Sequence, residues 1–156
     1  MQPGSIRKIT INDLDSIVEL ERKCFNRFIA YTPKQLKYLI TIANSNCLAE
    51  IINEKLRGFI IVLYNRRSKV AGIETLNVDP LFQGNGIGKK LIKAAEEDMY
   101  TMYIKKIRLE VSVGNISAIK LYERLGFIKI ALLKEYYTYK QYSSYDAFRM
   151  VKEIET

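Results

Sequence analysis

The chain has 156 residues, of which 48% are hydrophobic and 27% charged, a balance typical of one globular domain with its own core. Lysine and arginine outnumber aspartate and glutamate by 25 to 17, and this surplus suits either an anionic ligand or nucleic acid. The sequence contains no histidine, which excludes Ser-His-Asp and Cys-His catalysis and histidine-ligated zinc. Any proton transfer must therefore use carboxylate, tyrosine, lysine, cysteine or water.

The sequence shows no segment typical of membrane insertion or export. No apolar run approaches the roughly 20 residues that span a bilayer, and the first ten residues lack the apolar centre of a signal peptide. Cys24 and Cys47 have no metal-ligand spacing, and buried structural cysteines suit a reducing interior. We therefore expect a cytoplasmic protein that binds neither a membrane nor a metal.

Hydrophobic periodicity predicts the elements of the first half of the chain. The second helix is marked by "TPKQ", a capping box with proline in the first turn. The predicted elements are, in order, a strand at 6–11, a helix at 12–25, a helix from 32, and strands in "NCLAEIIN" (46–53) and "RGFIIVLYN" (57–65).

The second half alternates strands and helices. Gly126 suits a left-handed cap at the end of the last helix. The predicted elements are a strand at 69–78, a helix at 86–102, a strand at 106–113, a helix from Asn115 to Gly126, and closing strands at 127–137 and 145–153. Together the two halves predict one α/β domain with helices on a mixed sheet.

The stretch "DPLFQGNGIGKK", residues 79–90, places three glycines where a strand gives way to a helix. Such glycines let successive backbone N–H groups point at one anion, at the positive end of the helix. A Walker loop needs Ser or Thr where Lys90 stands, and a dinucleotide loop needs glycine where Lys89 stands. What remains is a Q-x-x-G-x-G pattern on Gln83, Gly86 and Gly88, or a glycine-rich helix entry without a ligand.

Two motifs taken together are more specific than either alone. "VDPLFQGNGIGKKLI" and, further along, "LEVSVGNISAIKLYERLGF" resemble the pyrophosphate loop and the fifth strand and helix of the GNAT superfamily of acetyl-CoA-dependent N-acetyltransferases. "LERKCF", "NVDP" and the late "YY…DAFRM" make the chain most similar to ribosomal-protein alanine acetyltransferases and their archaeal and eukaryotic N-terminal relatives. The resemblance implies a single GNAT domain over 1–156, with a mostly antiparallel mixed sheet splayed between strands 4 and 5.

The resemblance also implies a binding mode for acetyl-CoA, without a metal. Backbone groups of Leu76, Asn77 and Val78 would bond the pantetheine arm like an added strand, with the Val78 N–H stabilising the oxyanion. Asn115 and Tyr122 would contact the cofactor near its thioester. The phosphates would lie on Gln83, Gly84, Asn85, Gly86, Ile87, Gly88 and Lys89, with neutral Gln83 standing where many relatives have arginine.

Three residues are candidates for acid–base chemistry. Glu110 matches the glutamate given the role of base in the ribosomal alanine acetyltransferases, although it is also an ordinary position for an exposed strand glutamate. Glu74 is the alternative base. Alternation places it in one apolar row with Leu76 and Val78, where a carboxylate indicates a functional role unless it is ion-paired or exposed. Tyr122 follows Glu110 by twelve residues, the interval between base and acid in those relatives, and would protonate the departing thiolate unless it is a core tyrosine.

The loop "KEYYTYKQYSSYDAF" holds tyrosines that suit a peptide groove or the cover of a sheet edge. The resemblance implies that Tyr136 and Tyr137 bind the first residues of the substrate, opposite Tyr31. An α-amine, with a pKa near 8, is about 3 kcal/mol easier to deprotonate than a lysine near 10.4. We therefore expect acetylation of protein N-termini, with ribosomal or nascent chains as candidate substrates.

Three alternatives stay open. A GNAT enzyme acting on lysine side chains or on a polyamine would be favoured by an acidic pocket built by Glu19, Glu21 or Glu50. A basic nucleic-acid-binding module is less expected, because it leaves the glycine loop and "LYERLGF" unexplained. A sensor would bind acetyl-CoA without turnover. The sequence does not decide the oligomeric state or the need for a partner subunit.

Overall fold

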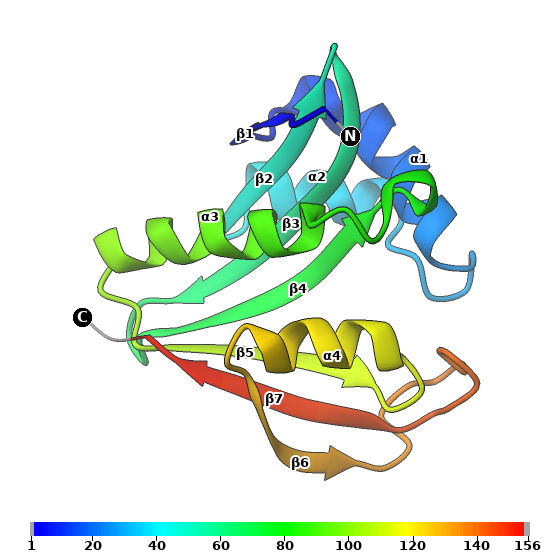
Figure 1. The fold of residues 1–156 in the computed structure, drawn as a ribbon, viewed down its shortest axis with the longest axis vertical. Coiled ribbons are helices and arrows are strands. Elements are labelled where there is room, and N and C mark those ends of the chain that lie inside the picture. The colour runs from blue at the N-terminus through cyan, green and yellow to red at the C-terminus, as the bar shows by residue number, and fades with distance from the viewer. Residues whose placement is uncertain (1, 155–156) are drawn as a thin grey trace.

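The computed structural model describes residues 2–154 (Figure 1). Its strands are β1 (Ser5–Lys8), β2 (Ser45–Ile52), β3 (Lys55–Asn65), β4 (Val70–Val78), β5 (Lys106–Ser112), β6 (Ile128–Leu133) and β7 (Ala147–Glu153). Its helices are α1 (Leu14–Cys24), α2 (Pro33–Thr41), α3 (Ile87–Thr101) and α4 (Ile116–Arg124), with short 3₁₀ turns η1 (Ile11–Asp13) and η2 (Pro80–Phe82). This order of helices and strands confirms the one predicted from periodicity.

The helices begin and end at the residues that carried the signals. Thr32 caps α2, because its Oγ1 accepts from the backbone N–H of Gln35 at 3.1 Å while the Gln35 side chain accepts from the Thr32 N–H at 2.9 Å. Asn115 caps α4 by accepting from the Ala118 N–H at 3.2 Å. Gly126 follows α4 with φ at +96°, the left-handed conformation expected there. None of the described helices is long and apolar enough to cross a membrane.

One closing strand is shorter than we predicted. The strand expected at 127–137 stops at Leu133, because pairing with β7 ends at the Leu133–Ala147 pair and Glu135 turns the chain with φ at +53°. Residues 134–146 therefore form a long β6–β7 loop that carries all the tyrosines of the tyrosine-rich segment.

The strands form one mixed sheet in the order β1-β2-β3-β4-β5-β7-β6, antiparallel except for the parallel pair β4–β5. This pair joins only Val70–Gly72 to Lys106–Arg108, although β4 continues to Val78 and β5 to Ser112. Beyond that point β4 is bonded only to β3 and β5 only to β7. The two strands separate, as Figure 1 shows, which confirms the predicted splay between strands 4 and 5.

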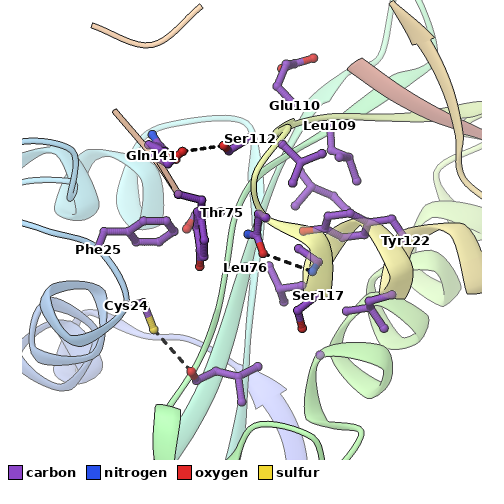
Figure 2. Close-up of a pocket in the computed structure, with 18 of the residues that line it drawn as sticks. Cys24, Phe25, Thr75, Leu76, Leu109, Glu110, Ser112, Ser117, Tyr122 and Gln141 are labelled. Atoms are coloured by element: carbon purple, nitrogen blue, oxygen red, sulfur yellow. Dashed lines mark hydrogen bonds between the residues drawn. The ribbon is translucent and has the colours of Figure 1, made fainter. Parts of the chain in front are cut away.

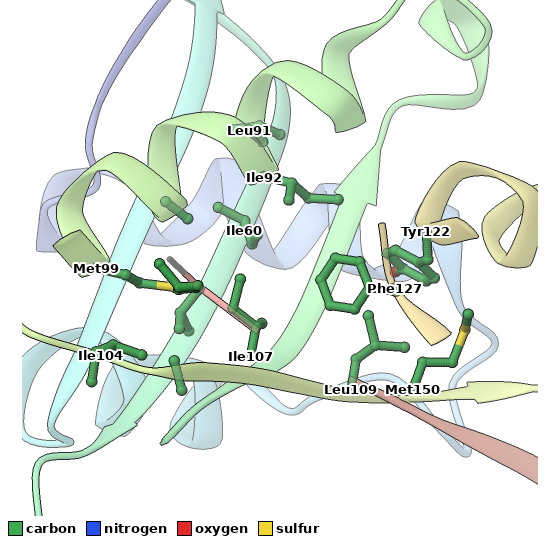
Figure 3. Packing of buried hydrophobic residues seen from close by; sticks show 14 of the residues in the cluster. Ile60, Leu91, Ile92, Met99, Ile104, Ile107, Leu109, Tyr122, Phe127 and Met150 are labelled. Atoms are coloured by element: carbon green, nitrogen blue, oxygen red, sulfur yellow. The ribbon is translucent and has the colours of Figure 1, made fainter. Parts of the chain in front are cut away.

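Each face of the sheet is covered by a pair of helices (Figure 1), and each pair closes its own core; Figure 3 shows the core under α3 and α4. The strand β3 is buried on both faces, with Ile60 toward α3 and Ile61 toward α1 and α2, which explains its continuous apolar sequence. The α3–α4 core contains Leu91, Ile92, Met99, Ile107, Leu109, Tyr122, Phe127 and Met150. The α1–α2 core contains Ile17, Leu20, Leu36, Leu39, Phe59 and Ile61.

Candidate active site

A cavity of about 770 Å³ opens where β4 and β5 separate. Its walls are residues 73–76 and Val78 of β4 and residues 109–112 of β5. On the α3–α4 side it is bordered by the glycine loop, the start of α3 and the inner side of α4; on the α1–α2 side, by α1, the α1–α2 loop and the β6–β7 loop. The cavity is therefore shared by elements from both faces of the sheet.

The glycine loop presents open backbone to this cavity. Gly84 and Gly86 have φ of +80° and +81°, and a Cβ at either would meet no atom within 4 Å. Helix α3 begins directly afterwards at Ile87, whose side chain is buried, so its free N–H groups and positive end lie beside the loop. Gly88 lets α3 approach α4 closely, since a Cβ there would lie 3.2 Å from Leu121. This geometry suits a phosphate held by backbone N–H groups.

The polar side chains of the loop mostly shape it. Gln83 Nε2 donates to the Val78 carbonyl at 3.1 Å, so the amide closes the turn instead of extending toward the phosphates. Asn85 Nδ2 donates to the Phe82 carbonyl at 3.0 Å. Lys89 lines the cavity, whereas Lys90 donates to a carbonyl of the N-terminal segment and is not part of the lining. Lys89 is thus the cation of the loop that is placed to meet an anion.

Asn115 and Tyr122 both line the cavity from the side of α4, as their spacing predicted (Figure 2 labels Tyr122). The Tyr122 side chain is buried against Phe127, with ring centroids 5.7 Å apart in an edge-to-face arrangement. Burial raises the pKa of Tyr122, with the neighbouring tyrosines adding to the effect. The raised pKa keeps the phenol protonated at neutral pH and makes it a weaker acid than a free tyrosine.

Glu110 reaches the cavity from the other face of β5, away from Leu109 and Tyr122 (Figure 2). Its Oε2 accepts from Arg149 Nε at 3.0 Å and lies 3.6 Å from Arg108 Nε. The side chain is 19% exposed. Glu110 is therefore an ion-paired carboxylate at the edge of the cavity, and an incoming amine competes with two guanidinium groups for it.

Glu74 does not occupy the row that alternation predicted. Leu76 and Val78 pack on the α3–α4 core, but the register of β4 on β3 skips Glu74, which makes it the extra residue of a β-bulge. The bulge turns the carboxylate to the α1–α2 side, where Oε1 accepts a hydrogen bond from the Tyr31 hydroxyl. Glu74 is an exposed residue of the cavity lining, and the expectation of a carboxylate in an apolar row was wrong.

Glu21 of α1 is a cavity residue to which the sequence assigned no role in the reaction. It is 1% exposed and accepts from the Tyr31 N–H at 3.0 Å, Asn77 Nδ2 at 3.0 Å and Thr75 Oγ1 at 3.5 Å. None of these partners is charged, and burial raises the pKa of Glu21. The available signal was its place beside Leu20 on the apolar side of α1, because a carboxylate there must be satisfied by buried partners.

The other two glutamates considered for an acidic pocket lie elsewhere. Glu19 is exposed on α1, 3.5 Å from Lys23. Glu50 forms a buried ion pair with Arg57, whose Nε lies 3.0 Å from Oε2. The carboxylates that line the cavity are therefore Glu21, Glu74 and Glu110.

The α1–α2 and β6–β7 loops, which both contribute residues to the cavity lining, contact each other where Phe28 stacks on Tyr139 with centroids 5.3 Å apart. The three tyrosines predicted to contact the substrate, Tyr31, Tyr136 and Tyr137, all line the cavity. The rings of Tyr136 and Tyr137 meet edge to face at 5.0 Å. Burial raises the pKa of all three, so each presents a neutral hydroxyl at neutral pH.

Further lining residues were not predicted as site residues. Cys24 Sγ donates to the Val78 carbonyl at 3.4 Å, and burial raises the pKa of this thiol to about 11 (Figure 2). Ser112 Oγ donates to the Gln141 carbonyl at 2.6 Å and ties β5 to the β6–β7 loop. Tyr142, on the same loop, also lines the cavity. Within residues 2–154, no group of three or more Cys, Asp or Glu side chains is placed to hold a metal ion.

Comparison with known proteins agrees with this arrangement. The model of the acetyltransferase (GNAT) family matches residues 14–127, and the chain belongs to this family. It is 32% identical over 162 residues to the uncharacterized N-acetyltransferase MJ1207 of Methanocaldococcus jannaschii, covering 96% of this chain and 67% of that protein. It is 30% identical over 146 residues to human N-alpha-acetyltransferase 30, covering 88% of this chain and 40% of the human protein.

The fold is also that of solved acetyltransferases. The crystal structure of the ribosomal-protein-S18-alanine N-acetyltransferase from Escherichia coli superposes with a TM-score of 0.87 at 23% identity, covering 98% of this chain and 95% of that one. The chain spans 67% and 40% of the length of the two curated relatives above. The family model and the sequence relatives therefore establish that the chain is a GNAT acetyltransferase, and the superposition shows that it has the same fold as the Escherichia coli protein.

Proposed function

We propose that this protein transfers the acetyl group of acetyl-CoA to the N-terminal α-amine of a protein or peptide. The observation that carries this proposal is the cavity between β4 and β5, with the glycine loop and Tyr122 on one side and carboxylates and tyrosines on the other. Donor and acceptor can then approach from opposite faces of the sheet and meet in the gap. The similarity to an N-alpha-acetyltransferase supports the α-amine as acceptor.

The donor side fits acetyl-CoA. The open backbone at Gly84 and Gly86 and the start of α3 would hold the pyrophosphate, with Lys89 adding a positive charge. The edge of β4 that β5 leaves unpaired would bond the pantetheine arm along 76–78, and Asn77 would contribute only its backbone, because its side chain bonds Glu21. The Val78 N–H would stabilise the oxyanion as the amine attacks the thioester carbonyl.

Proton transfers are assigned to the two ends of the gap. Glu110 would accept a proton from the attacking amine, directly or through water, and Glu74 is the alternative acceptor on the same side. Tyr122 would give its proton to the coenzyme A thiolate as the carbon–sulfur bond breaks. The ion pair with Arg149 holds the Glu110 carboxylate in place, so a productive amine must replace part of that contact.

The acceptor side fits a peptide end. Tyr31, Tyr136 and Tyr137 provide rigid surface with neutral hydroxyls on two loops that touch through Phe28 and Tyr139. An α-amine is partly neutral at physiological pH, so a site without histidine needs to supply less free energy to deprotonate it than to deprotonate a lysine. We extend the proposal to ribosomal or nascent chains in the cytoplasm as the substrates.

A second function is favoured by one observation. Three carboxylates, Glu21, Glu74 and Glu110, line one cavity, and Glu74 among them forms no ion pair with a described lysine or arginine, so a second amine of a polyamine could bind there. This alternative keeps the fold, the donor and the chemistry, and changes only the acceptor.

Coenzyme A release separates these possibilities. The acceptors are short peptides with free N-termini and no lysine, matched peptides that are blocked at the N-terminus but contain lysine, and spermidine. Turnover with the free α-amines alone supports the proposal. Turnover confined to blocked peptides or spermidine refutes it and selects the alternative. Binding of acetyl-CoA without any turnover would instead indicate a sensor or a missing partner.

A further inference from the structure

The carboxylates around the cavity differ in how their charge is balanced. Glu110 is paired with Arg149 and lies near Arg108. The hydrogen-bond partner of Glu74 is the Tyr31 hydroxyl, which is neutral, and among the described residues no lysine or arginine forms an ion pair with this carboxylate. In a chain of formal charge +8, Glu74 is therefore an exposed negative charge that the protein itself leaves without a counter-ion.

Glu74 is also held in place. The β-bulge turns it to the α1–α2 side, and the Tyr31 hydroxyl bonds its Oε1. Tyr31 is fixed in turn, because its backbone N–H donates to buried Glu21 at 3.0 Å. A carboxylate that is already oriented loses little side-chain freedom when it binds a partner, so it discriminates between partners better than a mobile one.

The position of Glu74 points to the acceptor and away from the donor. It precedes Val78 by four residues on β4, a separation of about 10 Å along the strand because one of the four steps belongs to the bulge, and the glycine loop begins beyond Val78. Glu74 shares the cavity lining with Tyr136 and Glu110. Burial raises the pKa of Tyr136, the charges of Glu110 and Glu74 raise it further, and those of Arg149 and Arg108 lower it, so the ring lies among both carboxylates and the guanidinium groups that pair with Glu110. Glu74 thus borders the acceptor end of the cavity, close to the candidate base.

We propose that Glu74 binds a cationic group that the acceptor carries in addition to its reacting amine. A lysine or arginine side chain within the first two residues of a peptide and the second amine of a polyamine share this chemistry. The inference rests on the proposed transfer to an amine and adds its selectivity: an acceptor with a second positive charge near the first is preferred.

The test compares acceptors that differ in one charge. Three peptides with free N-termini carry lysine, glutamine or glutamate at the second position, and a second set varies the first position. Spermidine and a monoamine of matched length form the other arm. Wild type, Glu74→Gln, Glu74→Lys and the control Glu97→Gln, which changes an exposed glutamate of α3 outside the cavity, are assayed by coenzyme A release.

The measured quantity is the ratio of kcat/KM for the lysine peptide to that for the glutamine peptide, because a general loss of activity cancels in it. We expect wild type and Glu97→Gln to share a ratio well above one. We expect Glu74→Gln to lower it about tenfold, mainly through KM, and Glu74→Lys to favour the glutamate peptide. The spermidine-to-monoamine ratio should move in the same way if the polyamine is the true acceptor.

Two results would overturn the inference. One is a wild-type ratio of one or below at both positions and in the amine arm. The other is an equal fall in activity with the lysine and glutamine peptides in Glu74→Gln, which would make Glu74 a general base or a structural residue. The same ratio is read from the dissociation constants of peptide–coenzyme A conjugates, so the inference is tested even if the proposed function fails and no peptide turns over.

Discussion

Replacing the buried carboxyl of Glu21 tests how α1 is joined to the splayed half of β4. Glu21→Ala would remove the acceptor of the partly buried Tyr31 N–H and one of the two acceptors of the buried Asn77 amide, which keeps its bond to Thr75 Oγ1. At about 1–3 kcal/mol for each lost hydrogen-bond acceptor, and less for the partly buried one, the loss of folding free energy is about 3 kcal/mol, a large part of the stability of a domain. Glu21→Gln keeps one acceptor oxygen and the shape of the side chain, so we expect it to cost about half as much.

Urea unfolding followed by circular dichroism at neutral pH gives the two free energies. The reasoning predicts that alanine costs at least about 1.5 kcal/mol more than glutamine, because only alanine removes both acceptors. Equal costs for the two variants, or a cost below about 1 kcal/mol for alanine, would show that these hydrogen bonds do not hold α1 to β4.

The pH dependence of the same variants has a definite sign. Because burial raises the pKa of Glu21 in the folded state, the part of its stabilisation that is linked to the bound proton is fully present below the unfolded pKa, about 4.3, and is lost as pH rises through the folded pKa. The stability of wild type relative to Glu21→Gln should therefore fall between about pH 4.5 and neutral pH. A difference that stays constant or rises over this range would contradict the burial argument.

Three further predictions concern the reaction and the cavity. Tyr122→Phe and Glu110→Gln should each lower kcat by one to about four orders of magnitude and retain acetyl-CoA binding, which calorimetry measures. Tyr100→Phe, on the exposed side of α3, is the control, and unchanged turnover in both variants would refute the roles proposed for Tyr122 and Glu110. Gly86→Ala should lower the free energy of unfolding by about 1 kcal/mol and raise the KM for acetyl-CoA, because φ at +81° strains any residue with a Cβ. A KM equal to that of wild type would argue against phosphate binding at this loop. Burial raises the pKa of Cys24 from 9.0 to about 11, so near pH 8 its thiolate fraction is about a hundredfold lower than that of a free thiol. Iodoacetamide should therefore label Cys24 slowly, as measured by peptide mapping, and labelling at the rate of a free thiol would show that the thiol is not buried.

The sequence by itself determined what depends on neighbouring residues. Periodicity predicted every helix and strand in order, and the cap signals at Thr32, Asn115 and Gly126 mark the observed ends, because these features follow from local backbone geometry. The glycines before α3 and the spacing of Asn115 and Tyr122 were readable for the same reason. A resemblance carried by two local motifs then implied the family that comparison confirms.

Only the tertiary structure decided how distant segments combine. The direction of Glu74 depends on a bulge, which exists because β3 and β4 do not match residue for residue, and no pattern within β4 reveals that mismatch. The partners of Glu21 come from a loop and from β4, 10 to 56 positions away in the chain. Residues that share no local period meet here because the sheet opens between β4 and β5, and the acceptor end of the cavity is built from these long-range contacts.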